Sequence, residues 1–169
     1  MLASSAPAMV PAAQSAVPAG PEGAAIATAD AVAGILAYSR WPNAPTTVRL
    51  CVAGSSPLIA RLSNRTLPDG RRVIVSQRAT GSLPGEGCDA IYLARIAPSD
   101  LERIARASAE RGIATMTDND PQCSSGIMVC FRIVPAGLTF DLNIDAVTRS
   151  GVRIDPRVLS LGRRSSGRP

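Results

Sequence analysis

The sequence has no histidine, and its 18 basic residues are all arginine, so lysine is absent as well. Without histidine there is no Ser–His–Asp triad, no Cys–His pair and no histidine metal ligand. Without lysine there is no Schiff-base nucleophile and no phosphate-loop lysine. These absences leave a thin acid–base inventory. We therefore expect a protein that is not an enzyme and needs no cofactor.

Aromatic residues make up only 3% of the chain, although 46% of it is hydrophobic. The core must therefore be built from Leu, Ile, Val and Ala. No apolar run reaches the roughly 18 residues that a membrane span needs, so we expect no membrane insertion. The net charge is +5, but the arginines are spread along the chain. A nucleic-acid-binding protein usually has a dense basic stripe, so we expect no nucleic-acid partner.

Both ends of the chain differ in composition from the middle. Residues 1–24 are rich in Ala, Pro and Ser, and Pro11–Ala16 resembles the small-residue cleavage region of an export signal. We expect this stretch to be a disordered tail or the remnant of a secretion signal, outside the fold. Residues 163–169 are expected to be a flexible basic tail. Residues 25–162 then form a single domain.

The hydrophobic patterns of this domain alternate between strand and helix. Apolar positions predict a helix over 24–39, which ends before Trp41-Pro42 because proline disfavours helix at the preceding residue. The clearest helix starts at Pro98 and has an inner stripe of Leu101, Ile104, Ala105 and Ser108. Further elements are expected as strands over 46–53, 72–76, 88–96 and 113–116, a short helix through 62, a hairpin of 127–134 with 138–144, and short helical pieces near 147 and 159. This order predicts an α/β fold with a mixed, mostly parallel sheet flanked by helices and an antiparallel C-terminal hairpin.

Four cysteines, Cys51, Cys88, Cys123 and Cys130, are the main chemical feature. Zinc sites usually contain closely spaced cysteine pairs, and this sequence has no Cys-x-x-Cys, so we expect no metal. Four buried free thiols are an alternative for a cytosolic chain. A bridge between Cys123 and Cys130 would require the chain to double back, and Ser124-Ser125-Gly126 is suited to that turn. Spacing alone does not choose among the three possible pairings.

Several segments resemble the YfiR family of periplasmic bacterial proteins. The resemblance includes the helix ending in Trp41-Pro42, the strand RLCVAG (49–54), CDAIYLA (88–94), GIATMTDN (112–119) and the cysteines flanking SSGIMV. Its most specific part is LTFDLNIDAVTRSGVRIDPRVLSLG (138–162), in which the recurrent positions are Phe140, Leu142, Asn143, Ala146, Gly151, Ile154 and Leu159.

This resemblance implies a periplasmic regulator with two disulfides, Cys51–Cys88 and Cys123–Cys130. Members of the family restrain an inner-membrane diguanylate cyclase by binding its periplasmic domain, and an outer-membrane lipoprotein can sequester them. The implied output is the level of cyclic di-GMP and, with it, biofilm formation. The bridges would stabilise the protein and could also tune it by redox state.

Two other functions are consistent with the residues. Asp118, Asp120, Asp141 and Asp145 could form an acid pair or a site for a hard metal ion, although turn formation and helix capping explain such residues equally well. A periplasmic small-ligand sensor could have a pocket near Gly54-Ser55-Ser56, at the end of a strand, although that turn could be only a helix cap.

Three expectations concern surfaces. Tyr38 and Trp41 follow the first helix and are candidate partner-binding residues, although a lone tryptophan is more often part of the core. Arg132 is expected to point outward and keep a sheet edge soluble. A homodimer could form if the edge of the hairpin paired with its mate.

Overall fold

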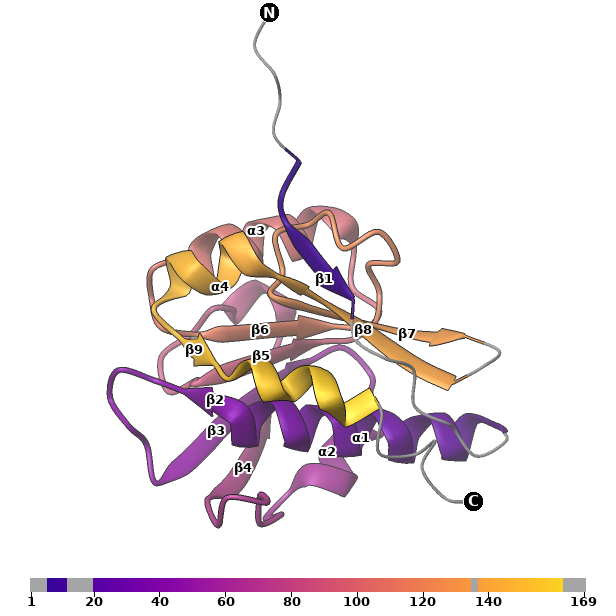
Figure 1. Cartoon of the computed structure of the whole chain (residues 1–169). Helices are drawn as coiled ribbons and strands as arrows, with labels where there is room; N and C mark the ends of the chain where they lie inside the picture. The colour runs from indigo at the N-terminus through magenta and orange to yellow at the C-terminus, as the bar shows by residue number, and fades with distance from the viewer. Residues whose placement is uncertain (1–5, 12–19, 135–136, 163–169) are drawn as a thin grey trace, which may run out of the picture.

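The computed structural model describes residues 6–11, 20–134 and 137–162, and it confirms the α/β class (Figure 1). Its main sheet has seven strands in the order β1-β8-β7-β6-β5-β3-β4. The strands are β1 (Met9–Pro11), β3 (Thr47–Ala53), β4 (Arg72–Gln77), β5 (Ala90–Leu93), β6 (Ala114–Thr117), β7 (Val129–Val134) and β8 (Gly137–Asn143). The five strands from β4 to β7 in this order run parallel, whereas β8 is antiparallel to β7 and β1 is antiparallel to β8.

Helices cover both faces of this sheet. The helical elements are α1 (Gly20–Tyr38), α2 (Leu58–Leu62), α3 (Pro98–Ser108), α4 (Ile144–Ser150) and the 3-10 helices η1 (Thr80–Ser82) and η2 (Pro156–Gly162). In Figure 1, α1 and η2 lie below the sheet, and α3 lies above it. A small second sheet pairs β2 (Ser39–Arg40) with β9 (Arg153–Ile154). Among the described residues, no helix is long and apolar enough to cross a membrane.

The two faces of the sheet belong to two separate cores. Successive side chains on a strand point to opposite faces. Tyr92 of β5 therefore lies in the core between the sheet and α1, whereas Ile91 lies in the core between the sheet and α3. Rings of Tyr92, Phe131 and Phe140 form a row in the α1 core, with centroid separations of 6.2 and 5.9 Å. All four cysteines lie in the α3 core. Strands β5 and β6 are buried on both faces, as is typical of parallel strands covered by helices.

Helix α1 ends where the sequence predicts, just before Trp41-Pro42, but it begins at Gly20, four residues before the expected start. The strand expected over 88–96 is shorter than predicted and begins at Ala90. The predicted hairpin is present as β7 and β8, although residues 135–136 of its turn lie outside the described residues.

The N-terminal segment differs from the expectation that residues 1–24 lie outside the fold. Met9–Pro11 pair with Asp141–Asn143 of β8, and the Ala8 carbonyl accepts a hydrogen bond from Ile144 N at 3.2 Å. The outer edge of β8 otherwise has unpaired backbone groups, which a short extended segment can satisfy. Residues 1–5, 12–19 and the predicted basic tail 163–169 lie outside the described residues.

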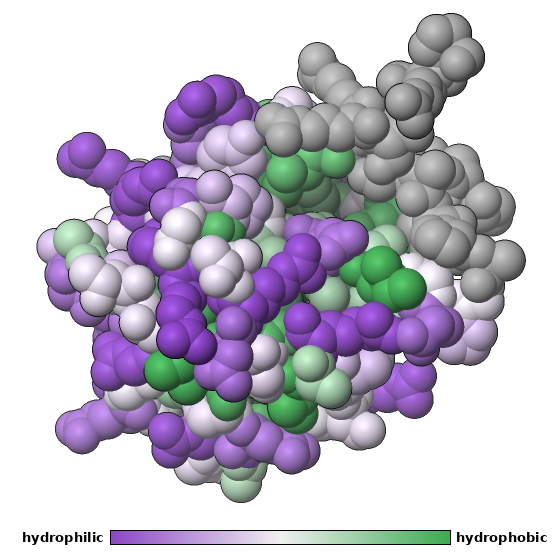
Figure 2. Space-filling view, turned by 90° about the horizontal axis from the view of Figure 1, so that it is seen from below, coloured by the Kyte–Doolittle hydropathy of each residue, from purple (hydrophilic) through white to green (hydrophobic). Residues whose placement is uncertain are grey.

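The other edge of the sheet is β4, which contains the exposed side chain of Ile74. Arg72 begins this strand and Arg78 follows it; charged side chains of this kind disfavour edge-to-edge association. Seen from below, the molecule has a largely hydrophilic face with small hydrophobic areas between the polar side chains (Figure 2).

Gly54 ends β3 in a left-handed conformation (φ +84°), and a Cβ there would lie 1.7 Å from the carbonyl oxygen of Ala94. Gly70 has a similar φ of +89°, but a Cβ at that position would meet no other atom within 4 Å. We expect Gly54→Ala to lower the free energy of unfolding by more than about 2 kcal/mol, because the side chain adds a backbone clash to the strain. Gly70→Ala should cost about 1 kcal/mol from strain alone. Urea unfolding of both variants measures the difference, and equal losses would contradict the close approach.

Candidate functional site

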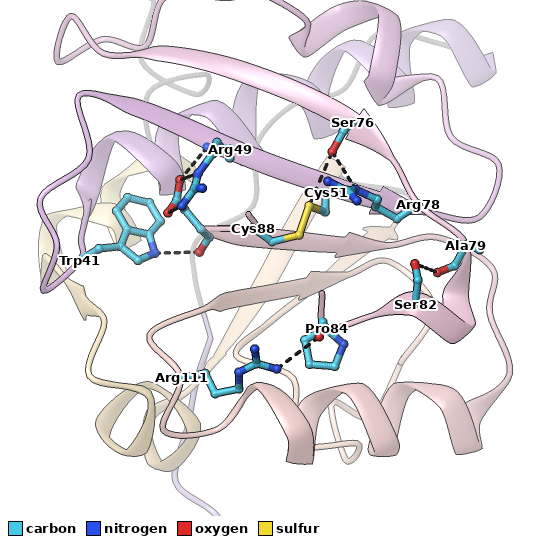
Figure 3. Close-up of a disulfide and its surroundings, with 11 residues drawn as sticks. Trp41, Arg49, Cys51, Ser76, Arg78, Ala79, Ser82, Pro84, Cys88 and Arg111 are labelled. Atoms are coloured by element: carbon cyan, nitrogen blue, oxygen red, sulfur yellow. Dashed lines mark hydrogen bonds and ion pairs between the residues drawn. A yellow bond between two sulfur atoms is a disulfide. The ribbon is translucent and has the colours of Figure 1, made fainter. Parts of the chain in front are cut away.

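The Cys51–Cys88 bridge lies between strands β3 and β5 of the main sheet (Figure 3). Cys51 is on β3, and Cys88 lies two residues before the first residue of β5, its parallel neighbour; the two Cα atoms are 5.7 Å apart. The Ser76 hydroxyl of β4 lies 3.6 Å from Cys51 Sγ. Both cysteines are buried in the core beneath α3. The bridge therefore joins the adjacent parallel strands β3 and β5 on the α3 side of the sheet, next to the edge strand β4.

Two arginines, Arg103 and Arg111, hold the loop that leads to Cys88 by hydrogen bonds to its backbone carbonyls. Arg111 donates to the Pro84 carbonyl at 3.2 Å (Figure 3). Arg103 of α3 donates to the carbonyl oxygens of Leu83 and Thr80 at 2.8 and 2.9 Å. The bridge and these hydrogen bonds together fix the long β4–β5 connection against α3.

Asp89, next to Cys88, organises a polar cluster at the same end of β3 and β5. Its carboxylate accepts two hydrogen bonds from the Arg49 guanidinium at 2.9 and 3.0 Å and a third from the Arg49 backbone N at 2.9 Å. Its carbonyl accepts from Trp41 Nε1 at 2.8 Å. Asp89 is buried whereas the Arg49 side chain is about half exposed, at 49%. Such a forked pair fixes geometry as well as charge.

The charge of Arg49 governs the ionisation of Asp89. Burial by itself raises the pKa of the Asp89 carboxyl, but the hydrogen bonds and the charge of Arg49, with a contribution from Asn43, outweigh it. The pKa of Asp89 therefore lies below its ordinary value of 3.8. A lowered pKa means that the ionised carboxylate stabilises the folded state.

The second bridge, Cys123–Cys130, closes the loop that leads into β7, with Cα atoms 5.6 Å apart. Cys123 has a positive φ of +49°, which turns the chain back on itself. Inside the loop, the buried Asp120 carboxylate accepts hydrogen bonds from Ser125 N at 2.9 Å and Ser125 Oγ at 2.5 Å. Gly126 packs against α3, where a Cβ would lie 3.5 Å from that of Ala105. The predicted turn at Ser124–Gly126 is thus held by sulfur and by a carboxylate.

Asp120 and the sulfurs of Cys123 and Cys130 lie within 4.8 Å of one another, and all three residues are buried. Metals bind cysteine as the thiolate, whereas these two sulfurs are bonded to each other. In the oxidised state Asp120 therefore serves the loop as a hydrogen-bond acceptor.

The four carboxylates considered as an alternative catalytic or metal site make separate contacts. Asp141 pairs with Arg132 at 2.8 Å, and Asp120 holds the bridged loop. Asp118 lies near the buried Tyr92 hydroxyl, whose pKa is raised well above 10.0 by burial first and by that carboxylate second. Asp145 is in the first turn of α4. Asn143 Oδ1 accepts from Ala146 N at 3.1 Å, so it caps that helix.

The structure also places the other residues that the sequence analysis singled out. Trp41 is only 5% exposed and packs in the α1 core, so its side chain does not form an exposed anchor. Tyr38 is partly buried against the same core, with the Arg157 guanidinium 5.7 Å from its ring centroid. Arg132 was expected at a sheet edge. Strand β7 lies between β6 and β8, but its pairing with β6 covers only Val129 and Cys130, so among the described residues Arg132 lies where β7 pairs with β8 alone. At the Gly54-Ser55-Ser56 turn, the Ser56 hydroxyl accepts from Leu58 N at 3.2 Å, although the N-cap position of α2 is Pro57.

Sequence reasoning missed a cavity between α3 and α4. Ser108, Thr115, Arg106 and Arg149 are among the residues that line it. The available signal was Ser108 itself, a hydroxyl within the otherwise apolar inner stripe of α3.

A family model described as YfiR/HmsC-like matches residues 26–163, which include nearly all of the helices and strands described above. The chain belongs to the YfiR/HmsC-like family. Membership supports a periplasmic regulatory role in general. Both disulfides that the resemblance implied are present, and all four cysteines are paired.

Two solved structures are similar to this chain. An O-acetylhomoserine (thiol)-lyase from Campylobacter jejuni is 12% identical over 83% of this chain and 37% of its own, with a TM-score of 0.51. An O-acetylhomoserine sulfhydrylase from Wolinella succinogenes is 11% identical over 93% of this chain and 50% of its own, with a TM-score of 0.48. The chain thus spans half or less of the length of either enzyme. The first likeness shows the fold alone, and the second is too low to support an argument. The Campylobacter structure contains a pyridoxyl-lysine group, whereas this chain has no lysine.

We expect Asp89→Asn to lower the free energy of unfolding by about 1–3 kcal/mol at about pH 7, because it removes the charge that Arg49 binds. The folded-state pKa is depressed, so this contribution is present above the unfolded value of 3.8 and is lost as the pH falls through the folded one. Urea unfolding from about pH 7 to about pH 3 should show the variant and the unmodified protein converging. Asp100→Asn, which breaks the exposed pair with Arg103, is the control and should change stability by less than about 0.5 kcal/mol. A pH-independent loss in Asp89→Asn would contradict the charge argument.

Proposed function

We propose that the protein is a periplasmic, non-catalytic regulator that binds the periplasmic domain of an inner-membrane diguanylate cyclase and restrains it. An outer-membrane lipoprotein would sequester the regulator and release the cyclase. The observation that carries this proposal is the YfiR/HmsC-like match over residues 26–163 together with the two formed bridges.

The chemistry of the side chains supports binding rather than turnover. The chain lacks histidine and lysine, and the carboxylates that we considered for catalysis are engaged in separate ion pairs, turns and helix starts. A general acid–base pair needs two groups that converge on one reacting atom. Asp118, Asp120, Asp141 and Asp145 do not form such a pair.

The oxidised cysteines support a location outside the cytoplasm. Disulfides persist in oxidising compartments such as the bacterial periplasm, whereas the cytosol keeps thiols reduced. A regulator exposed to that compartment can also respond to its redox state. Reduction of Cys123–Cys130 would release the turn at Ser124–Gly126 and loosen β7 behind it, which would weaken the grip on the partner.

Of the predicted aromatic pair, Trp41 is buried whereas Tyr38 is only partly buried, so we propose Tyr38 alone as a contact for the cyclase. A homodimer through the hairpin would also have less free strand edge available for pairing than the sequence suggested. The outer edge of that hairpin is β8, and Met9–Pro11 already occupy it opposite Asp141–Asn143. What remains for pairing is Gly137–Phe140 of β8 and, on the β7 side, Phe131–Val134 beyond the pairing with β6, so we propose any homodimer through the hairpin there.

The direct test is to delete the gene and measure cyclic di-GMP in the source bacterium. We expect the level to rise, because the cyclase loses its restraint, and to fall again when the unmodified gene is restored. A gene with both Cys123→Ser and Cys130→Ser should lower cyclic di-GMP less than the unmodified gene does. In the chain-entropy account, that variant also loses up to about 2.5 kcal/mol of stability, because the bridge closes a short loop.

Capture from membranes identifies the partner. The purified chain, fitted with a photo-crosslinker, should enrich a diguanylate cyclase that has a periplasmic domain. Arg78→Gln is the matched control for the double cysteine variant, because this exposed arginine lies away from the Cys123–Cys130 loop. It should behave as the unmodified protein does. Unchanged cyclic di-GMP on deletion, with no cyclase captured, would refute the proposal.

A further inference from the structure

Strand β4 is one edge of the main sheet, at the opposite end from β1 (Figure 1). On one side its backbone faces β3, where Arg78 N donates to the Val52 carbonyl at 2.9 Å. On the other side, Val73 N donates to the Arg65 carbonyl at 2.9 Å, and the Val73 carbonyl accepts from Asn64 N at 3.0 Å. The loop before β4 therefore occupies the outer edge of the strand at Val73.

The rest of this outer edge, at Val75 and Gln77, has no backbone partner among the described residues. Residues two apart in a strand direct their backbone groups to the same side, so those of Val75 and Gln77 point away from β3, as those of Val73 do. An edge strand with free N–H and carbonyl groups is a template for pairing with another chain. This stretch can therefore bond an extended segment of polypeptide.

One face of β4 is apolar at its centre and basic at both ends. Ser76 Oγ lies 3.6 Å from Cys51 Sγ, which is in the core on the α3 side of the sheet. Because alternate side chains share a face, Arg72 and Ile74 point to that side too, and Ile74 is 52% exposed there. Arg78 follows on the same side, since its Nε donates to Ser76 Oγ at 3.3 Å (Figure 3). A strand laid along this edge would meet an exposed isoleucine between two guanidinium groups.

Arg72 and Arg78 differ from the other exposed arginines in their position, at the two ends of this free edge. Neither forms an ion pair within the part of the chain that the structure describes, and residues 71–78 include no acidic side chain. If two copies paired through β4, like charges would lie close together, which destabilises strand pairing. Acidic side chains at the same spacing would instead meet opposite charges. The edge therefore favours an acidic segment over a second copy of this chain.

We propose that the free edge of β4 binds an extended segment of a partner protein by strand addition. Acidic residues of the segment would lie opposite Arg72 and Arg78, and an apolar residue would pack against Ile74. Backbone hydrogen bonds give such a complex its affinity, and alternate side chains give it specificity. The surface is separate from Tyr38, the proposed cyclase contact, which packs against the core on the α1 side. The inference therefore does not rest on the cyclase proposal, and we expect the segment to belong to a different protein.

The test uses the purified, oxidised full chain, isotope-labelled for NMR, and the end-capped synthetic peptide ETVTVTE as the probe. In an extended conformation its glutamates and valines lie on one face, at the spacing of Arg72, Ile74, Ser76 and Arg78. We expect saturable shifts of the Val75 and Gln77 amide signals at about millimolar peptide, with slower hydrogen exchange at both amides.

The peptide KTVTVTK is the control and should bind about tenfold or more weakly, because its lysines lie opposite arginines. Arg72→Glu with Arg78→Glu should reverse this preference, so that KTVTVTK becomes the tighter ligand. A reversal requires a folded edge, so unfolding cannot produce it. Arg106→Glu with Arg149→Glu, at exposed arginines of α3 and α4, makes the same change of net charge and should leave the preference as it is. No saturable shift at Val75, or equal binding of both peptides to the unmodified protein, would overturn the proposal.

A second pair of variants tests the apolar contact. Ile74→Thr should weaken ETVTVTE about threefold or more, because it removes apolar contact area. Ile133→Thr is the matched control, since Ile133 of β7 is also 52% exposed, and it should leave the affinity unchanged. Arg78→Gln should weaken ETVTVTE while cyclase capture stays unchanged, which separates this site from the cyclase contact. Unchanged affinity for ETVTVTE in both the Ile74→Thr and the charge-reversal variants would refute the site.

Discussion

The covalent bond between Cys51 and Cys88 is the constraint on which the rest of the structure depends. It joins β3 to the segment just before β5, and the neighbouring Asp89 holds Arg49 and Trp41 at the same place. In the chain-entropy account, a loop of this length contributes about 4 kcal/mol, which is comparable with the stability of a small domain. Strand β4 flanks this bridged pair on one side, and β6, β7, β8 and β1 extend the sheet on the other.

The second bridge has a local role that relates structure to function. It closes a short loop against α3, and the same loop forms a wall of the cavity next to Arg106 and Arg149. A chain without histidine or lysine has few means of turning over a substrate, but it can still bind a ligand or partner. Rigid loops serve that purpose because little conformational freedom is lost on binding. The bridges thus suit a regulator that acts by contact.

Local sequence patterns were sufficient for elements with a clear period or clear ends. Strand β3, helix α3 and the β7–β8 hairpin are close to where they were predicted. Met9–Pro11 could not be predicted as a strand, because three residues with a proline have no periodicity and only the open edge of β8 gives them a partner. The cysteine pairing came from the family resemblance and not from spacing. The cavity required tertiary structure, since Arg149 of α4 is far in sequence from Ser108 and Thr115.

The central claim is that both bridges are formed in the working protein, and cysteine alkylation tests it most directly. Native material should be isolated without reductant in the presence of an alkylating agent, unfolded, and examined by peptide mass spectrometry. The account predicts no alkylated cysteine before reduction, and linked peptides that pair Cys51 with Cys88 and Cys123 with Cys130. Alkylation of all four cysteines before any reductant is added would contradict it.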